Sequence, residues 1–137
     1  AGTTLDLTHR LTRTGPVLSS DEVVLEEADP TIALLLAGGA LANDATLERV
    51  EDGSGGYHAV GDPTEGAMVV AAARLGLWKA DMERLMPRVA EVPFTSERKR
   101  MTTVHRVPSD STSDGEPLRR LLAQLPTSPH IAFSKGP

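Results

Sequence analysis

The spacing of apolar residues changes along the chain, and this spacing predicts which segments form strands and which form helices. In residues 3–18, leucines alternate with polar residues, which is typical of a strand with one buried face. Residues 63–75 are mostly small or apolar, which favours a helix buried on most sides. A similar run in residues 30–43 predicts another helix, and residues 79–86 have the spacing of an amphipathic helix.

Both long helices are predicted to begin at an Asp-Pro pair. Asp29 and Asp62 can each cap a helix, because a carboxylate accepts hydrogen bonds from the free N–H groups of the first turn. Pro30 and Pro63 suit the first helical position, where the missing N–H would have no partner in any case. Glu65 then lies in the first turn of the second helix, where the helix dipole favours an anion.

The helices are predicted to end at residues that disfavour their continuation. Asn43 and Asp44 end the first helix, Gly76 ends the second, and Pro87 ends the third.

The second half of the chain is predicted to contain a hairpin. Residues 88–94 and 100–107 have the composition of two antiparallel strands joined through residues 95–99. Shorter elements complete the pattern: a turn at 51–56, a strand at 57–60, a loop at 108–117, a helix at 118–125 and a strand at 130–136. Residues 19–27 fit neither pattern. Hairpin-linked strands beside paired helices indicate an α+β fold, with an antiparallel sheet flanked by helices.

Composition narrows the class of protein. The 137 residues suit one domain, with 14 Lys and Arg against 19 Asp and Glu and a net charge of −5. This acidic balance argues against a general nucleic-acid binder. The chain has no cysteine, which excludes disulfides and thiolate metal sites. No stretch approaches the roughly 20 apolar residues of a membrane span, and the N-terminus lacks the pattern of a signal peptide.

Three short segments carry residues that suit a flat ring and phosphate groups. The first, Gly-Asp-Pro-Thr-Glu at 61–65, is better explained, when taken alone, as a capped helix start. The second, Pro-Phe-Thr-Ser-Glu-Arg-Lys-Arg-Met at 93–101, is better explained, when taken alone, as a hairpin with a solvated charged turn. The third, Phe-Ser-Lys-Gly at 133–136, is a common way to end a strand. Each segment alone is therefore weak evidence of function.

In this order and spacing, the three segments together resemble the nucleotide-binding domain of P-type cation-transporting ATPases. The form of the motifs is closest to the calcium-pump-like branch, with magnesium and sodium/potassium pumps next. The resemblance covers roughly residues 55–137, whereas residues 1–54 match only in outline. It implies the fold of that domain and a single domain over residues 1–137, cut from a longer membrane pump and ending soon after the Lys-Gly motif.

The resemblance also implies a set of ATP-binding residues. Phe94 corresponds to the ring that stacks on adenine, and Glu65 to the carboxylate that accepts a hydrogen bond from the adenine amino group. Lys99 corresponds to the cation near the ribose and phosphates, and Lys135 to the lysine beside the nucleotide. Gly136 has no side chain, so it would let the backbone approach a ligand closely.

Some roles stay open at this point. Thr64 either shapes the pocket or only begins the helix. Arg98 is a candidate for nucleotide binding, as is its neighbour Arg100, but either side chain could instead point to solvent or pair with Glu91 or Glu97.

The chain departs from the family at two positions. Ser96 stands where some members carry an arginine, so a phosphate contact from this position is in doubt. Ser96 is kept as a candidate binding residue, with a local hydrogen bond in the turn as its alternative. Pro137 stands where alanine is usual.

The absent motifs limit the expected chemistry. The chain has no Asp-Lys-Thr-Gly-Thr, no Thr-Gly-Glu and no P-loop, so it lacks the aspartate that accepts phosphate in this family. We therefore expect no catalytic residue and no ATP hydrolysis by this chain alone. No two histidines are four residues apart, and no metal site is predicted.

The sequence thus predicts an ATP-binding domain on the cytoplasmic side of a membrane pump. Expected ligands are ATP and ADP, with Mg²⁺ accompanying ATP in the whole pump, and expected partners are its phosphorylation and actuator domains. Two alternatives remain: a free-standing phosphotransferase or phosphatase, and a protein-interaction module whose basic segment meets an acidic partner. The first alternative would need a nucleophile or an aspartate cluster, and the second would show no preference for adenine.

Overall fold

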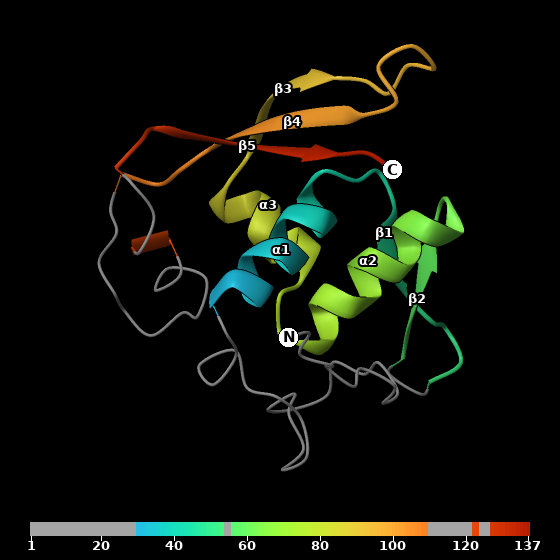
Figure 1. Ribbon diagram of the computed structural model, residues 1–137. Helices are drawn as coiled ribbons and strands as arrows, with labels where there is room; N and C mark the ends of the chain where they lie inside the picture. The colour runs from blue at the N-terminus through green and yellow to red at the C-terminus, as the bar shows by residue number, and fades with distance from the viewer. Residues whose placement is uncertain (1–29, 54–55, 110–121, 124–126) are drawn as a thin grey trace, which may run out of the picture.

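The computed structural model describes residues 30–53, 56–109, 122–123 and 127–137. In this part of the chain the elements are α1 (Pro30–Leu41), β1 (Thr46–Arg49), β2 (Tyr57–Val60), α2 (Pro63–Arg74), α3 (Lys79–Leu85), β3 (Arg88–Val92), β4 (Met101–Arg106) and β5 (His130–Lys135). Helices α1 and α3 lie below the sheet formed by β3, β4 and β5, as Figure 1 shows. The predicted α+β fold with an antiparallel sheet is confirmed.

Some predictions concern parts of the chain outside the described residues. These are the strand at 3–18, the ambiguous segment at 19–27, the Asp29 cap, the loop from residue 110 onward and most of the helix at 118–125.

The start of α2 follows the predicted chemistry. The Asp62 carboxylate accepts hydrogen bonds from the N–H groups of Thr64, at 2.9 Å, and Glu65, at 3.1 Å. Pro63 is the first helical residue. The helix stops before Gly76, whose φ of 81° lies in the left-handed region that glycine adopts without strain. Both predicted ends of this helix are therefore confirmed.

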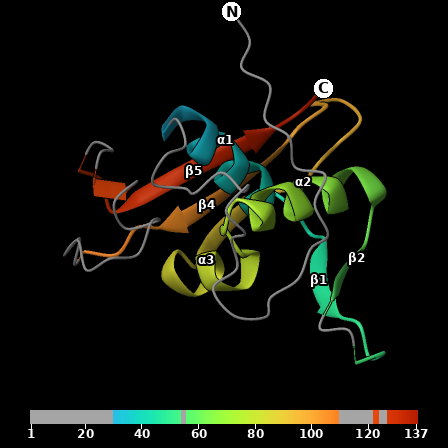
Figure 2. The same ribbon diagram turned by 90° about the horizontal axis from the view of Figure 1, so that it is seen from below.

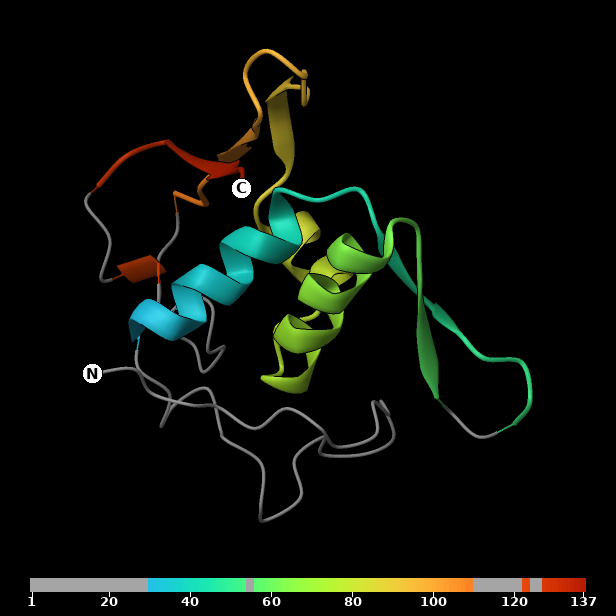
Figure 3. The same cartoon turned by 45° about the vertical axis from the view of Figure 1, so that its right-hand side comes forward.

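The region after α1 contains a strand that the sequence pattern does not indicate. Helix α1 ends at Leu41, as Asn43 and Asp44 predict, and β1 follows at Thr46–Arg49. This strand has four residues with Leu47 as its one apolar member, so no alternation is visible. Its antiparallel partner is β2, and together they form a hairpin that projects beyond α2 in Figure 3.

The second sheet is antiparallel, with β4 in its centre. Strand β3 pairs with β4, so the predicted hairpin is confirmed, and β4 pairs with β5 from Met101 opposite Lys135 to Arg106 opposite His130. Side chains of β4 alternate in burial, and those of Met101, Thr103 and His105 are buried. Figure 2 shows from below how β4 and β5 run behind α1.

The core lies between the helices and the inner face of this sheet. Helix α1 packs closely on β5, because a methyl group at Gly38 would come within 2.6 Å of the Phe133 ring. The buried core cluster contains mostly small and flexible apolar residues, namely Ala33, Ala37, Ala40, Leu41, Ala72, Leu75, Leu77, Met82, Met86 and Leu122.

His105 lies on β4, the central strand of this sheet, and is completely buried between the sheet and the helices. Its Nδ1 lies 3.0 Å from the carbonyl oxygen of Met86, which can only accept, so Nδ1 carries the proton. Its Nε2 lies 2.9 Å from the hydroxyl of Thr103, which donates to it. Burial lowers the pKa of His105, although the hydrogen bond to Met86 acts in the opposite direction. The imidazole is therefore held neutral.

This depressed pKa predicts a pH dependence of folding. Below the ordinary pKa of histidine, about 6.5, the unfolded chain binds a proton that the folded chain excludes, so stability falls as pH falls. Between about pH 7.5 and 5.5, the wild type should lose more stability than a His105→Asn variant, measured by urea unfolding. Parallel profiles for wild type and His105→Asn would contradict the prediction.

Candidate functional site

Two of the sequence-predicted residues meet where α2 begins and β5 ends. The Lys135 ammonium lies 2.5 Å from Oε1 of Glu65. Both side chains are partly buried, with 22% of each exposed, so the charges attract each other more strongly than a fully solvated pair. The contact joins the first turn of α2 to the last residue of the sheet.

Glu65 is also bonded to the α1–β1 link, which we define as residues 42–45. Its other carboxylate oxygen, Oε2, lies 3.3 Å from the N–H group of Asp44. Its backbone carbonyl accepts a hydrogen bond of 2.8 Å from the Asn43 side chain. Asn43 and Asp44 were predicted only to end α1. Their contacts with Glu65 could not be predicted, because they join residues more than 20 positions apart in the sequence.

Two cations hold the carbonyl groups of this region. The Lys79 ammonium donates to the carbonyls of Asn43, at 2.7 Å, and Ala45, at 2.6 Å. The Arg88 guanidinium donates to the carbonyls of Leu41, at 3.0 Å, and Asn43, at 2.7 Å. Carbonyls at the end of a helix carry a partial negative charge, which suits both cations. The roles of Lys79 and Arg88 could not be predicted from the sequence, because the carbonyls they bond are backbone groups, which leave no residue pattern.

The two cations differ in their electrostatics. Burial lowers the pKa of Lys79, and Glu83, 3.9 Å from its ammonium, acts in the opposite direction. Burial also acts to lower the pKa of Arg88, but hydrogen bonds to Asp44 and Glu91 outweigh it and raise this pKa overall. Glu91 is thus bonded to Arg88, at 3.0 Å. Its pairing with Arg98 or Arg100 was one of the alternatives that the sequence left open.

The loop between β3 and β4 contains the aromatic and basic residues of the second motif. Phe94 is exposed over 59% of its surface. The Thr95 hydroxyl accepts from the Arg98 N–H group, at 3.1 Å, and the Thr95 carbonyl accepts from the Lys99 N–H group, at 2.8 Å. Thr95 thus makes the local contacts of this turn, and its neighbour Ser96 is exposed.

Lys99 has a constrained backbone. Its φ of 56° lies in the left-handed region, which costs energy for a residue with a side chain. Gly136 lies directly against it, since a methyl group at Gly136 would come within 3.0 Å of the Lys99 carbonyl oxygen. The small size of Gly136 therefore serves close packing between the ends of the β3–β4 loop and β5.

A basic depression opens at this point of contact. Its volume is about 350 Å³, and it is lined by Arg98, Lys99, Arg100, Ser134, Lys135, Gly136 and Pro137. It gathers cations from two segments that are distant in sequence, and it has the character of a site for an anion.

The structure places some of the predicted site residues in the lining of the basic depression and leaves others outside this lining. Arg98, Lys99, Lys135 and Gly136 line the basic depression. Glu65 is joined to the same place through Lys135. The remaining candidates are exposed: Phe94 and Ser96 in the β3–β4 loop and Thr64 on the first turn of α2.

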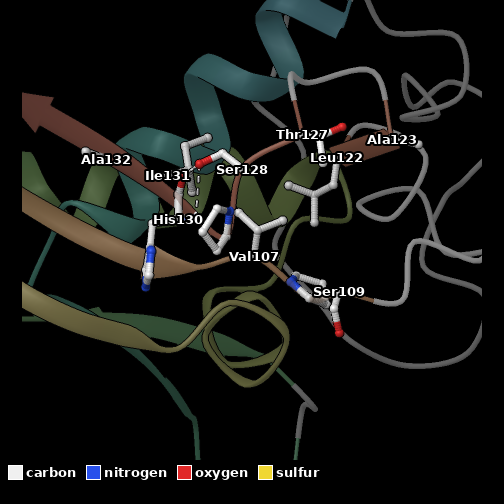
Figure 4. Close-up of a pocket in the computed structure, with 11 residues that line it drawn as sticks. Val107, Ser109, Leu122, Ala123, Thr127, Ser128, His130, Ile131 and Ala132 are labelled. Atoms are coloured by element: carbon white, nitrogen blue, oxygen red, sulfur yellow. Dashed lines mark hydrogen bonds between the residues drawn. The ribbon is translucent and has the colours of Figure 1, made fainter.

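A second cavity, of about 660 Å³, lies at the opposite end of β5 and is more apolar. Figure 4 shows Val107, Leu122 and Ile131 along its lining, with a hydrogen bond between Ser128 and His130 at its edge. Its lining residues adjoin ranges that the structure does not describe, so we assign it no function. Within the described ranges, no group of three or more His, Asp or Glu residues is placed to hold a metal ion.

Comparison with known proteins identifies the family. The family model of the P-type ATPase cytoplasmic domain N matches residues 31–119. The chain is 42% identical over 92 residues to a probable cation-transporting ATPase F of Mycobacterium tuberculosis, covering 67% of this chain and 10% of that protein. It is 38% identical over 87 residues to a calcium-transporting ATPase of Bacillus subtilis, covering 64% of this chain and 9% of that protein.

A mammalian relative is similar over a comparable range. The chain is 32% identical over 98 residues to the calcium-transporting ATPase type 2C member 1 of Bos taurus, covering 70% of this chain and 9% of that protein. The chain thus spans about a tenth of the length of the curated relatives it matches. Among the residues that the structure describes, no helix has the length and apolar character needed to cross a membrane.

The backbone of Lys99 generates a prediction about stability. Lys99→Gly should raise the free energy of unfolding by up to about 1 kcal/mol, because glycine adopts a φ of 56° without strain. The matched control is Arg100→Gly, which should lower stability because Arg100 has no left-handed backbone to relieve. Urea unfolding of both variants provides the measurement, and a loss of stability in Lys99→Gly would contradict the prediction.

Proposed function

Because the chain belongs to the family of P-type ATPase cytoplasmic N domains, we propose that it binds ATP and presents it to the phosphorylation domain of a cation-transporting pump. The observation that carries this proposal is the basic depression at the end of β5, with the Glu65 carboxylate joined to it through Lys135. A hydrogen-bond acceptor beside clustered cations suits a molecule with a donor at one end and phosphates at the other.

The two ends of the nucleotide have different requirements. The adenine amino group is a donor, and Glu65, an acceptor when ionised, would receive it. Phe94 has an exposed ring available for stacking on the base. The phosphates would lie towards Arg98 and Lys99, whose charges they would neutralise.

Magnesium would accompany the nucleotide. Mg²⁺ is commonly held by the phosphates of a nucleotide together with one or two carboxylates, and here it would be bound by the phosphates of ATP in the whole pump. The named relatives are cation- and calcium-transporting ATPases, which favours cation transport by the pump that contains this domain. Its partners would then be the phosphorylation and actuator domains, on the cytoplasmic side of the membrane.

The Lys135 ammonium would have a different partner in the ligand-free and in the nucleotide-bound domain. In the ligand-free chain its ammonium is bonded to the carboxylate oxygen that the adenine amino group would approach. The base and the ammonium would therefore compete for Glu65. Once displaced, the ammonium would still border the basic depression, where the phosphates offer it a new partner.

The first test measures nucleotide binding by the wild type and by Phe94→Ala. We expect the wild type to bind ATP and ADP with a Kd of about 0.1 to 10 mM, and GTP more weakly. Phe94→Ala should weaken ATP binding by roughly 1–3 kcal/mol through loss of stacking. Because the ring is exposed, its removal should change the free energy of unfolding by less than about 0.5 kcal/mol.

Titration calorimetry or NMR shifts, together with thermal melts, provide these measurements. A folded wild type that does not bind millimolar ATP would overturn the proposal. Equal affinity for ATP and GTP would instead favour the interaction-module alternative.

The second test separates the two positions of Lys135 by using adenosine, which has no phosphates. Lys135→Met should strengthen adenosine binding by roughly two- to fivefold, because Glu65 is then free of its ammonium partner. The same change should weaken ATP binding by roughly three- to tenfold, because the phosphates lose a cation. Lys99→Met, the matched control, should weaken ATP binding alone. If Lys135→Met weakens adenosine and ATP equally, Lys135 contacts the base and the competition is refuted.

A further inference from the structure

Asn43 is a completely buried polar residue at the junction of α1, α2 and β1. Its side chain is 0% exposed. Its Nδ2 donates to the carbonyls of Gly39, at 3.2 Å, and Glu65, at 2.8 Å, and its Oδ1 accepts from the Ala45 N–H group, at 2.7 Å. The amide group thus donates two hydrogen bonds and accepts one. These bonds reach α1, α2 and the residue that precedes β1.

The backbone of Asn43 is fixed as firmly as its side chain. Its carbonyl oxygen accepts from Lys79, at 2.7 Å, and from Arg88, at 2.7 Å. These cations belong to α3 and β3, so Asn43 is tied to four different elements besides the α1–β1 link itself. A residue held at this many points has little freedom to shift, and it can serve as a reference position for its neighbours.

The contacts of Glu65 depend on this position. Asn43 holds the Glu65 backbone, and the next residue, Asp44, offers its N–H group to Oε2 of the Glu65 carboxylate. Consecutive residues of one rigid segment therefore set both where the Glu65 backbone lies and which way its carboxylate turns. A binding group that must meet a ligand atom within about 0.5 Å requires support of this kind.

We propose that Asn43 is a positioning residue that fixes the Glu65 carboxylate and thereby sets the preference of this domain for adenine over guanine. The proposal rests on the nucleotide-binding function proposed above. Adenine presents an amino donor where guanine presents a carbonyl acceptor, so a carboxylate fixed at this point attracts one base and repels the other. A mobile carboxylate would turn away from guanine and lose that discrimination.

The experiment is a double-mutant cycle on nucleotide affinity in the 137-residue chain. Kd values for ATP and GTP are measured for the wild type, Asn43→Ala, Glu65→Ala and the double variant. Asn43→Ala should weaken ATP binding by roughly five- to tenfold and change GTP binding much less, which lowers the ATP-to-GTP preference. In the Glu65→Ala background, Asn43→Ala should have no further effect on ATP binding, because Asn43 acts through Glu65.

Two further variants separate positioning from general loss of structure. Asn43→Ser is uncharged and keeps a hydroxyl that can accept from the Ala45 N–H group, but it is too short to donate to both Gly39 and Glu65. It provides the same test if Asn43→Ala does not fold, and the same loss of preference is expected. Leu75→Ala removes a buried side chain at the far end of α2 and should lower stability while it leaves the ATP-to-GTP preference unchanged.

The outcomes distinguish this inference from the proposed function. If the folded wild type binds no nucleotide, or if Glu65→Ala binds ATP as the wild type does, the assignment of Glu65 to adenine fails and the inference fails with it. If Glu65→Ala weakens ATP binding but Asn43→Ala weakens ATP and GTP equally, only the inference is overturned. An additive effect of the two substitutions on ATP binding would overturn it as well.

Discussion

The site depends on the two cations that hold the end of α1. An ammonium and a guanidinium in a partly buried position are unfavourable unless their N–H groups find partners, and the carbonyls of Leu41, Asn43 and Ala45 supply them. The same carbonyls would otherwise be unpaired at the end of a helix. The cations therefore gain acceptors for their N–H groups, and the carbonyls gain donors. These bonds fix α3 and β3 to the segment that contacts Glu65. Without Lys79 and Arg88, that segment would keep the bonds of the Asn43 side chain and of its own N–H groups, but the carbonyls of Asn43 and Ala45 would lose these partners.

An acidic chain can form a basic site only where several of its cations lie close together. The chain carries a net charge of −5, yet arginine and lysine line one depression where the β3–β4 loop meets β5. Exposed charges farther apart than about 8 Å are largely screened at physiological salt, so the distant carboxylates barely affect a polyanion there. The left-handed backbone of Lys99 is part of this arrangement, because Gly136 packs against its carbonyl and no side chain intervenes. The fold thus accepts local strain where two segments approach to form the basic surface.

The parts of the fold that could be predicted from the sequence are those with local causes. The Asp62 cap, the Gly76 stop and the β3–β4 hairpin each follow from a few neighbouring residues, and the structure has all three. Strand β1 could not be predicted, because pairing with β2 rather than its own pattern makes it a strand. Only the family resemblance implied that Glu65 and Lys135 belong to one site, and their direct contact was not predicted. The roles of Lys79, Arg88 and Asn43 at the end of α1 could not be predicted, because the groups they bond there are mainly backbone groups, which every residue has.

The Glu65–Lys135 pair gives the ligand-free site a defined state. A partly buried carboxylate without a partner would be unfavourable, and so would a partly buried ammonium, so their contact stabilises the empty site. A nucleotide that replaces this contact gains only the difference between its own hydrogen bond and the one it displaces. The nucleotide therefore binds more weakly than the number of its contacts suggests. Because one partner of the carboxylate replaces another, the exchange is reversible. Reversible binding of this kind suits the proposed function, in which the domain would present its nucleotide to a phosphorylation domain.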